Sequence, residues 1–175
     1  MATSTYNLIA SQVVGSGGAS AITFLSIPQT YTDLKLTFSI RGTQSSDLQD
    51  NSLITLSGST SYSSKLLFGQ GSGSPSSAST STTSLNLSEY HPSGGATGST
   101  FGNGELYIPN YANTSYNKSI SSDFVIENNG TATFMGLSAG LSSYTGAVTS
   151  ITFTPVSGDS YAQYSTFYLY GIKNS

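Results

Sequence analysis

Residues 22–41 read ITFLSIPQTYTDLKLTFSIR, and the second half of this stretch decides the fold class. From Leu34 to Arg41 the side chains alternate, with Leu, Phe and Ile at even positions and Lys, Thr, Ser and Arg at odd ones. A period of two over eight residues predicts an antiparallel β-strand with one buried and one solvated face. Pro28 ends an earlier strand, so we expect a hairpin with its turn at residues 29–33, at the centre of a β-sandwich.

Short apolar and aromatic segments of the same kind recur along the whole chain, separated by turns rich in Gly, Ser and Asn. No segment has helical periodicity. The sequence therefore predicts an all-β protein, an antiparallel β-sandwich of about ten short strands. The run Asn128-Asn129-Gly130 is a strong turn signal and predicts a hairpin of residues 117–127 with residues 132–141.

Two segments near opposite ends of the chain resemble each other. Each begins with Ile-Thr-Phe, at residues 22–24 and 151–153, and each is predicted to run strand, turn, strand. The second of these predicted hairpins joins residues 148–155 to residues 165–173. Two similar hairpins near the chain ends favour a jelly roll, in which the ends lie in adjacent strands.

We expect residues 1–175 to form a single domain, which is long enough to bury a core. Residues 69–83 have almost no apolar side chains and residues 91–104 are rich in Gly and Ser, so both are predicted to be long exposed loops. The N-terminus lacks the basic start and apolar run of a signal peptide. No segment approaches ~18 consecutive apolar residues, so no membrane contact is expected.

The composition is unusual in its lack of charge. Charged residues make up 7 % of the chain, against roughly 25 % in an average soluble domain, and the net charge is −3. Few charges give little protection against self-association, which fits a protein covered by partners in an assembly. The five basic residues are scattered, which speaks against nucleic acid as a partner. Without Cys, disulfides and thiolate metal sites are excluded.

No pattern in the chain predicts catalysis. His91 is the only histidine and lacks a patterned nucleophile and orienting carboxylate, so we interpret it as an ordinary loop residue. A glycosidase would need two carboxylates on facing strands. The acids on or beside predicted strands are Glu89, Glu105, Asp123 and Glu127, and the alternation places Glu105 on an outward face. We expect no enzyme activity.

Cofactor and metal sites are not expected either. Asp47, Asp50 and Asn51 are the best candidate calcium ligands, but their spacing matches no known calcium loop. Residues 69–73, GQGSG, resemble a phosphate loop without the helix and Lys that phosphate binding uses.

Tyrosines gather at two places, around the end of one predicted strand and near the C-terminus. Tyrosine is favoured at interfaces and sugar platforms because its ring is apolar and its hydroxyl forms hydrogen bonds. Core filling, a protein interface and a glycan platform all stay open, and the absence of Trp weakens the glycan interpretation. The candidate partner interface is Tyr107, Tyr111 and Tyr116.

The chain closes with STFYLYGIK over residues 165–173, after a Ser-Ile-Thr-Phe strand and a turn that contains Gly. This pattern resembles small β-sandwich virion proteins of tailed bacteriophages, those of marine and cyanobacterial phages above all. Residues 21–36, AITFLSIPQTYTDLKL, and residues 105–113, ELYIPNYAN, match the same group. The usual Gly before the final Ser is Tyr164 here, which predicts a different last turn.

The resemblance implies a non-enzymatic virion structural protein. The first hypothesis is a capsid decoration (cement) protein, a homotrimer on the capsid exterior that binds the major capsid protein and stabilises the shell. The second is a tail- or fibre-associated receptor-binding adhesin that recognises a host glycan through residues 69–83, residues 91–104 or a tyrosine platform. A free carbohydrate-binding module is a third.

Overall fold

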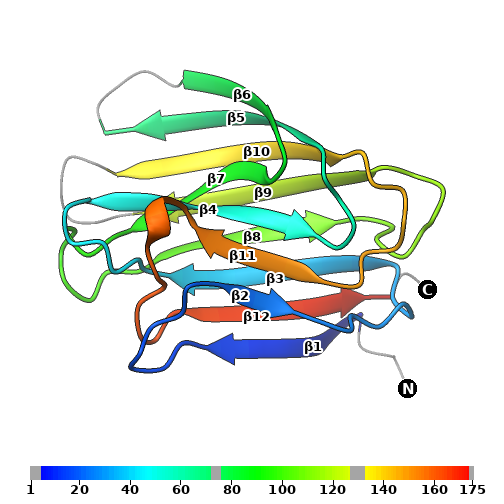
Figure 1. The fold of residues 1–175 in the computed structure, drawn as a ribbon, viewed down its shortest axis with the longest axis horizontal. Helices are drawn as coiled ribbons and strands as arrows, with labels where there is room; N and C mark the ends of the chain where they lie inside the picture. The colour runs from blue at the N-terminus through cyan, green and yellow to red at the C-terminus, as the bar shows by residue number, and fades with distance from the viewer. Residues whose placement is uncertain (1–4, 72–75, 127–132, 174–175) are drawn as a thin grey trace.

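The computed structural model describes residues 5–71, 76–126 and 133–173. In this part of the chain two antiparallel β-sheets pack face to face (Figure 1), which confirms the predicted all-β sandwich. The larger sheet has eight strands in the order β1-β12-β3-β8-β9-β10-β5-β6. Their bounds, in chain order, are β1 Tyr6–Val13, β3 Asp33–Ile40, β5 Tyr62–Gln70, β6 Ser76–Thr82, β8 Gly102–Ile108, β9 Lys118–Ile126, β10 Phe134–Ser142 and β12 Thr166–Ile172.

The smaller sheet has four strands in the order β2-β11-β4-β7. Their bounds are β2 Ile22–Phe24, β4 Gln49–Leu56, β7 Leu85–Pro92 and β11 Ile151–Pro155, and a 3-10 helix, η1 Val156–Gly158, follows β11. In Figure 1 the smaller sheet lies over the middle of the larger one, whose end strands extend beyond it.

The core lies between the sheets and is centred on β3. Leu34, Leu36 and Ile40 are completely buried and Phe38 almost so, as the alternation predicts. The Phe38 ring meets the ring of Phe153 from the smaller sheet at a centroid distance of 6.0 Å. Large rings fill the space between the sheets even though only 36 % of the residues are hydrophobic.

The predicted hairpin of residues 22–41 is wrong. β2 pairs with β11 in the smaller sheet, whereas β3 lies between β12 and β8 in the larger one. Residues 25–32 carry the chain across, with Ser26 in a left-handed conformation (φ 52°) and Ile27 buried. Packed sheets lie about 10 Å apart, so this connection suits a crossing between layers. Alternation identifies a half-buried strand but not the sheet to which it belongs.

The predicted hairpin of residues 148–155 with residues 165–173 is wrong for the same reason, because β11 and β12 lie in different sheets. The two similar segments near the chain ends instead pair with each other, strand by strand, in both sheets. The two Ile-Thr-Phe segments pair with each other in β2 and β11, with Thr23 opposite Thr152 and their hydroxyl oxygens 3.0 Å apart. In the other layer β3 pairs with β12.

The first and last strands are neighbours. β1 pairs with β12, with Tyr6 opposite Ile172, and the Lys173 N–H donates to the Thr5 carbonyl at 3.1 Å. The chain also changes sheet between β1 and β2, β2 and β3, and β3 and β4. Both features are what a jelly roll requires, and the jelly-roll topology itself stays a prediction.

The predicted exposed loop at residues 69–83 is largely wrong. Residues 69 and 70 belong to β5, and residues 76–82 form β6, which pairs with β5 at the edge of the larger sheet. Residues 72–75 lie outside the described part of the chain. A strand of Ser, Thr and Ala has no apolar alternation, so only its backbone pairing identifies it.

The predicted exposed loop at residues 91–104 is also wrong in part. Its ends belong to β7 and β8, and Ser93 and Ala96 are buried. The Arg41 guanidinium donates hydrogen bonds of 2.8–3.0 Å to the carbonyl groups of Ala96, Thr97 and Thr100. Arg41 thus helps to hold the segment against the sandwich, together with hydrogen bonds from the backbone N–H groups of Ser93 and Gly95 to the carbonyls of Leu48 and Asp47.

The predicted hairpin of residues 117–127 with residues 132–141 is confirmed, since β9 and β10 pair in register over their whole length. Its predicted turn lies outside the described residues. A second apolar cluster joins this hairpin to β5 and is covered by the Tyr90 ring of β7; its buried members are Leu66, Phe124, Ile126 and Phe134.

Candidate functional site

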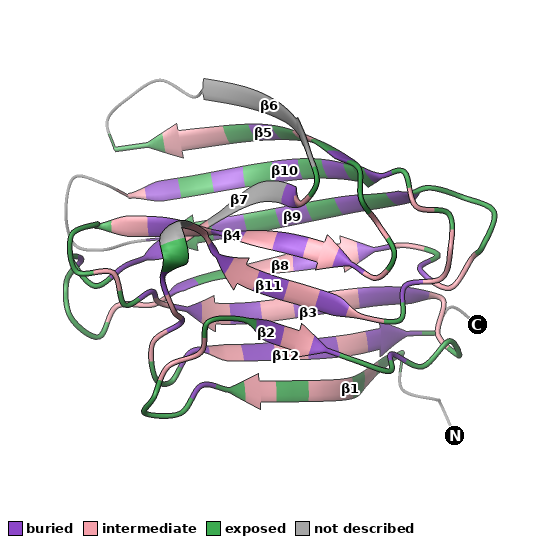
Figure 2. Cartoon of the chain, in the orientation of Figure 1, coloured by how far each residue is buried: buried purple, intermediate pink, exposed green. Residues whose placement is uncertain are grey.

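The larger sheet packs one face on the smaller sheet and turns the other toward solvent; we call the second the outer face. Burial alternates residue by residue along β9 and β10, which separates the two faces (Figure 2). Five large apolar side chains on the outer face are 42–64 % exposed. These residues, which we call the apolar patch, are Leu67, Val125, Met135, Leu137 and Leu141.

The strand register brings four residues of the apolar patch side by side, while Leu141 lies farther along β10, beyond Ala139. Leu137 of β10 lies opposite Leu67 of β5, and Met135 lies opposite Val125 of β9. Side chains directly opposite on one face are about 5 Å apart. The wet face of an antiparallel sheet is ordinarily polar, so a cluster of exposed apolar side chains there indicates an interaction surface.

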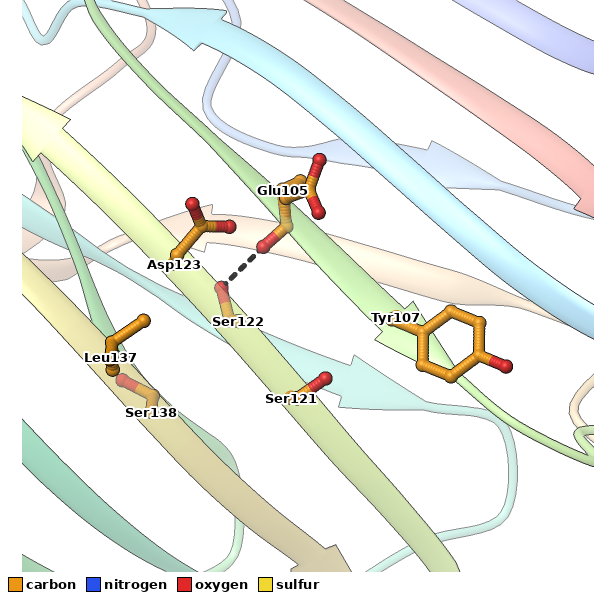
Figure 3. A pocket seen from close by; sticks show the side chains of 7 residues that line it. All are labelled: Glu105, Tyr107, Ser121, Ser122, Asp123, Leu137 and Ser138. Carbon is orange, nitrogen blue, oxygen red and sulfur yellow. Dashed lines mark hydrogen bonds between the residues drawn. The ribbon is translucent and has the colours of Figure 1, made fainter.

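Beside the patch a hollow of about 280 Å³ opens between β8, β9 and β10 (Figure 3). Glu105 and Asp123 lie directly opposite each other, and burial, followed by the Glu105 charge, raises the pKa of Asp123. The lining consists of Glu105, Tyr107, Ser121, Ser122, Asp123, Leu137 and Ser138. Carboxylates and hydroxyls accept hydrogen bonds from the hydroxyl or ammonium groups of a ligand. The lining includes no His, Lys or Arg, the side chains whose nitrogen can activate a hydroxyl as a nucleophile.

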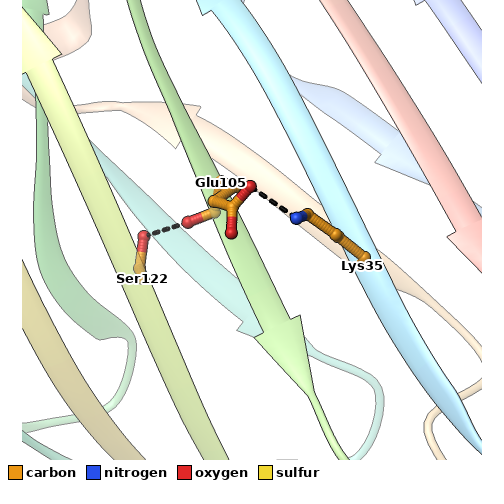
Figure 4. A network of polar contacts seen from close by, with 3 residues as sticks. All are labelled: Lys35, Glu105 and Ser122. Carbon is orange, nitrogen blue, oxygen red and sulfur yellow. Dashed lines mark hydrogen bonds and ion pairs between the residues drawn. The ribbon is translucent and has the colours of Figure 1, made fainter.

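An ion pair borders this hollow. Lys35 Nζ lies 2.6 Å from Glu105 Oε2 (Figure 4), and the hydrogen bond to Glu105 raises the pKa of Lys35. On the other side of β8, Ser122 Oγ donates to the backbone carbonyl of Glu105 at 2.8 Å. The outward position predicted for Glu105 is therefore confirmed, and its side chain ties β8 to β3.

Two further hollows follow the apolar patch. One, of about 260 Å³, lies around Gly69, Val125 and Met135. The other, of about 500 Å³, lies around Lys65 and Ala139. Gly and Ala leave depressions beside the projecting Met, Val and Leu side chains, so the outer face alternates between projections and recesses.

Of the three tyrosines predicted as a partner interface, Tyr107 lies at the end of β8 beside the first hollow. Its hydroxyl donates to Asp33 Oδ2 at 2.8 Å, and the Asn110 N–H donates to Asp33 Oδ1 at 2.9 Å. Burial and the bond to Asp33 raise the pKa of Tyr107. The Tyr107 ring borders the outer face, but its hydroxyl already donates its hydrogen bond to Asp33.

An interface role for Tyr111 is wrong. Its side chain is completely buried in the main core and its hydroxyl donates to the carbonyl of Pro28. Tyr116, by contrast, is 63 % exposed. The structure thus separates the three tyrosines among sheet end, core and turn, and leaves Tyr116 as the exposed member.

Buried Lys118 fixes the turn that carries Tyr116, and the sequence did not predict this role. Its Nζ donates hydrogen bonds of 2.7–2.9 Å to the carbonyls of Asn113, Tyr116 and Thr145. Burial lowers the pKa of Lys118. A Lys at an inward position of an alternating strand is the signal that could have marked it, because an inward cation needs buried acceptors.

Of the acids considered for a carboxylate pair, Glu105 and Asp123 come together on the outer face. The side chain of Glu89 and all of residue 127 lie outside the described part. Of the calcium candidates Asp47, Asp50 and Asn51, Asp50 is buried and accepts a hydrogen bond from the Asn51 N–H. Among described residues no group of three or more His, Asp or Glu could hold a metal ion. Of residues 69–73, the first two end β5.

The placement of His91 in a loop is wrong. His91 is completely buried in β7, opposite Asp50 of β4, with its ring centroid 5.8 Å from that of Tyr161. Asp50 Oδ2 has no hydrogen-bond partner among the described residues, and burial raises the pKa of Asp50 to about 6. Nothing in the local sequence marks this buried polar pair.

Comparison with known proteins identifies no family. No family model matches the chain, no curated protein matches it, and no solved structure matches it. The resemblance to phage virion proteins therefore stays a prediction. Across the described ranges, no helix has the length and apolar character to cross a membrane.

Proposed function

We propose that this chain is a non-enzymatic virion structural protein of a tailed bacteriophage that decorates the capsid. It binds the major capsid protein on the outer head surface, assembles as a homo-oligomer and stabilises the shell. The gain comes from contact area: a standard interface buries about 1,600 Å², and repetition over the shell multiplies small contributions. The sequence resemblance to phage virion proteins is the first support.

The observation that carries the proposal is a pair of separate exposed apolar surfaces on a weakly charged body. One is the apolar patch on β5, β9 and β10. The other is β1, at the opposite end of the larger sheet, where Tyr6, Leu8 and Val13 are exposed. A protein that bridges shell subunits needs two contact surfaces, and an edge strand offers its free backbone groups as well.

Deletion of the gene from a phage that carries it tests the role. We expect mutant heads to release DNA at a lower temperature or after a weaker osmotic shock, and purified protein to restore resistance. Val13→Lys, which adds a charge to the β1 edge, should restore less than the wild type does. Unchanged head stability after deletion would rule out cementing.

A tail-associated adhesin is the second candidate, and the hollow beside Glu105, Tyr107 and Asp123 favours it. Carboxylates can accept hydrogen bonds from sugar hydroxyls, and an aromatic ring offers an apolar surface beside them. A glycan array with the wild type and Asp123→Asn tests this role: saturable binding that the variant loses supports the adhesin. Copy number separates the roles independently, since hundreds per particle indicate decoration and tens indicate the tail.

A further inference from the structure

We propose that two copies of this chain associate through the outer face, about a two-fold axis that runs along β10. The contact rests on the described surface and does not depend on the virion role. In a decorating dimer the apolar patch would join the two copies, and the exposed β1 strand of each copy would contact the capsid. The apolar patch lies at its centre, where interfaces are most apolar and least charged. The hydroxyl-rich remainder of the outer face forms the rim.

The outer face has the size that a dimer contact needs. Strands β8, β9, β10 and β5 have seven to nine residues each. The axis along β10 also brings β6 of one copy over β8 of the other, so five strands overlap. With strands about 4.8 Å apart and about 3.4 Å per residue, these five present roughly 650 Å² in projection. A stable interface buries about 800 Å² of accessible surface on each partner, and projecting side chains give the sheet more accessible surface than its projected area.

Shape on the two sides of β10 is complementary under this symmetry. The axis places β9 of one copy over β5 of the other, while β10 meets its own counterpart. Val125 and Gly69 flank Met135 in the same row of the sheet, so Val125 lies over Gly69 of the second copy. A projecting side chain thereby meets the recess of about 260 Å³. Leu137 packs on Leu137 of the second copy.

The positions of two charged side chains, Lys65 and Asp123, favour the same two-fold arrangement. Lys65 on β5 and Asp123 on β9 are separated by β10, roughly 10 Å apart across the sheet, too far for an ion pair within one copy. About the axis, Lys65 lies over Ser121 of the second copy. Asp123 of that copy is two residues farther along β9, a diagonal neighbour that the long Lys65 side chain can reach. The contact holds this pair twice, once on each side of the axis.

The outer face carries no net charge that would repel a copy of itself. Its charged side chains on the described strands are Lys35, Lys65, Glu105 and Asp123, two of each sign. About the axis, Val125 meets the recess at Gly69 and Lys65 comes within reach of Asp123, which itself lies over Leu67 of the second copy. Met135, Leu137 and Leu141 meet their own counterparts. A second copy is therefore the occupant that shape and charge together favour.

Sedimentation equilibrium of the full chain between about 1 and 100 μM tests the proposal. We expect a dimer in this range. Leu137→Glu should weaken association at least tenfold and leave the circular dichroism spectrum and thermal unfolding unchanged, because this side chain is 62 % exposed. The matched control is Leu25→Glu, which adds the same charge at a side chain 71 % exposed outside the sheets and should leave the dimer intact.

A charge exchange tests the axis itself. Lys65→Glu and Asp123→Lys should each weaken the dimer, and the double variant should restore it, an outcome that a general loss of solubility cannot produce. A monomer at every concentration, the trimer implied by the resemblance to phage virion proteins, or a dimer that Leu137→Glu does not weaken would overturn the proposal. A double variant that stays weak would overturn the stated symmetry. The capsid assay and this one can fail independently.

Discussion

Asp50 and Asp159 are carboxyl groups of equal burial with opposite surroundings. Both are 8 % exposed. Burial by itself raises the pKa of Asp159, but hydrogen bonds from Thr43, Gln44 and Ser160 outweigh it and lower the pKa overall. Asp50 has one such bond, from the Asn51 N–H, and faces His91 across the ladder. The two residues therefore respond to pH in opposite directions.

Replacement of Asp50 by Asn is expected to stabilise the protein at neutral pH. The pKa of Asp50 in the folded protein, about 6, exceeds its usual 3.8 because of burial, with smaller contributions from Asp159 and Asp47. The folded state thus binds this proton more tightly, and stability falls as pH rises from about 4 to 6. Asp50→Asn should remove this fall and raise the free energy of unfolding at pH 7 by about 1–2 kcal/mol. Urea unfolding at pH 4.5 and 7 measures both; no gain at pH 7 would contradict the prediction.

Replacement of Asp159 by Asn is expected to destabilise it instead. The carboxylate accepts from the Thr43 N–H and hydroxyl at 3.0 and 2.6 Å and from Ser93 Oγ at 3.1 Å. An amide cannot accept all of these, so unfolding at pH 7 should become about 1–3 kcal/mol easier. Because the pKa of Asp159 is lowered, its contribution is present above about pH 4 and lost in acid, so wild type and variant should converge near pH 2. A constant difference between pH 7 and pH 2 would argue against this account.

At this scale the sequence predicts surface residues better than buried polar ones. The outward position of Glu105 follows from alternation, and the structure agrees. Tyr111 and Tyr116 belong to the same tyrosine cluster in the sequence, yet Tyr111 is buried in the core and Tyr116 is exposed in a turn. Asp50 and His91 are 41 positions apart in sequence and meet only through the β4–β7 ladder. Long-range pairing, which no local pattern records, decides such contacts.

Among the strands, β10 depends on a glycine for its fit to β9. A Cβ atom at Gly136 would lie 2.4 Å from the ring of Phe124, its partner in the ladder. Gly136→Ala should therefore force the ring to move and lower stability by about 1–3 kcal/mol. Gly17→Ala is the control, because nothing lies within 4 Å of its added methyl group. Thermal unfolding should separate the two variants, and equal melting temperatures would refute the packing argument.

The existence of most strands is predictable from the sequence, and their partners are not. The alternation from Leu34 correctly predicts β3 and its buried face. The same alternation does not show to which of the two sheets a strand belongs. β2 and β3 were therefore expected to pair, although residues 25–32 cross between the sheets. β6 escapes prediction because it pairs through its backbone alone. The apolar patch was not predicted either, since it needs β5 beside the β9–β10 hairpin, a pairing between segments that are far apart in the sequence.

The molecule as a whole brings its two ends together, and a circular permutant should exploit this. Ile172 lies opposite Tyr6, so a short Gly/Ser linker between the termini turns β12 and β1 into a hairpin. The new ends would lie between Ser16 and Gly17, in an open turn. We expect the same circular dichroism spectrum and faster refolding, because the most distant pairing becomes local. Stopped-flow refolding measures the rate; an unfolded permutant would contradict the expected tolerance.

The position of β12 between β1 and β3 also affects how a cell makes this protein. The ribosome delivers β12 after both of the strands that it separates. A nascent chain therefore cannot build the larger sheet in order of synthesis. Until β12 has been made, the edges of β1 and β3 that pair with it have no strand partner. The larger sheet can close only once β12 has been synthesised, and high-level expression should benefit from chaperones that shield these edges.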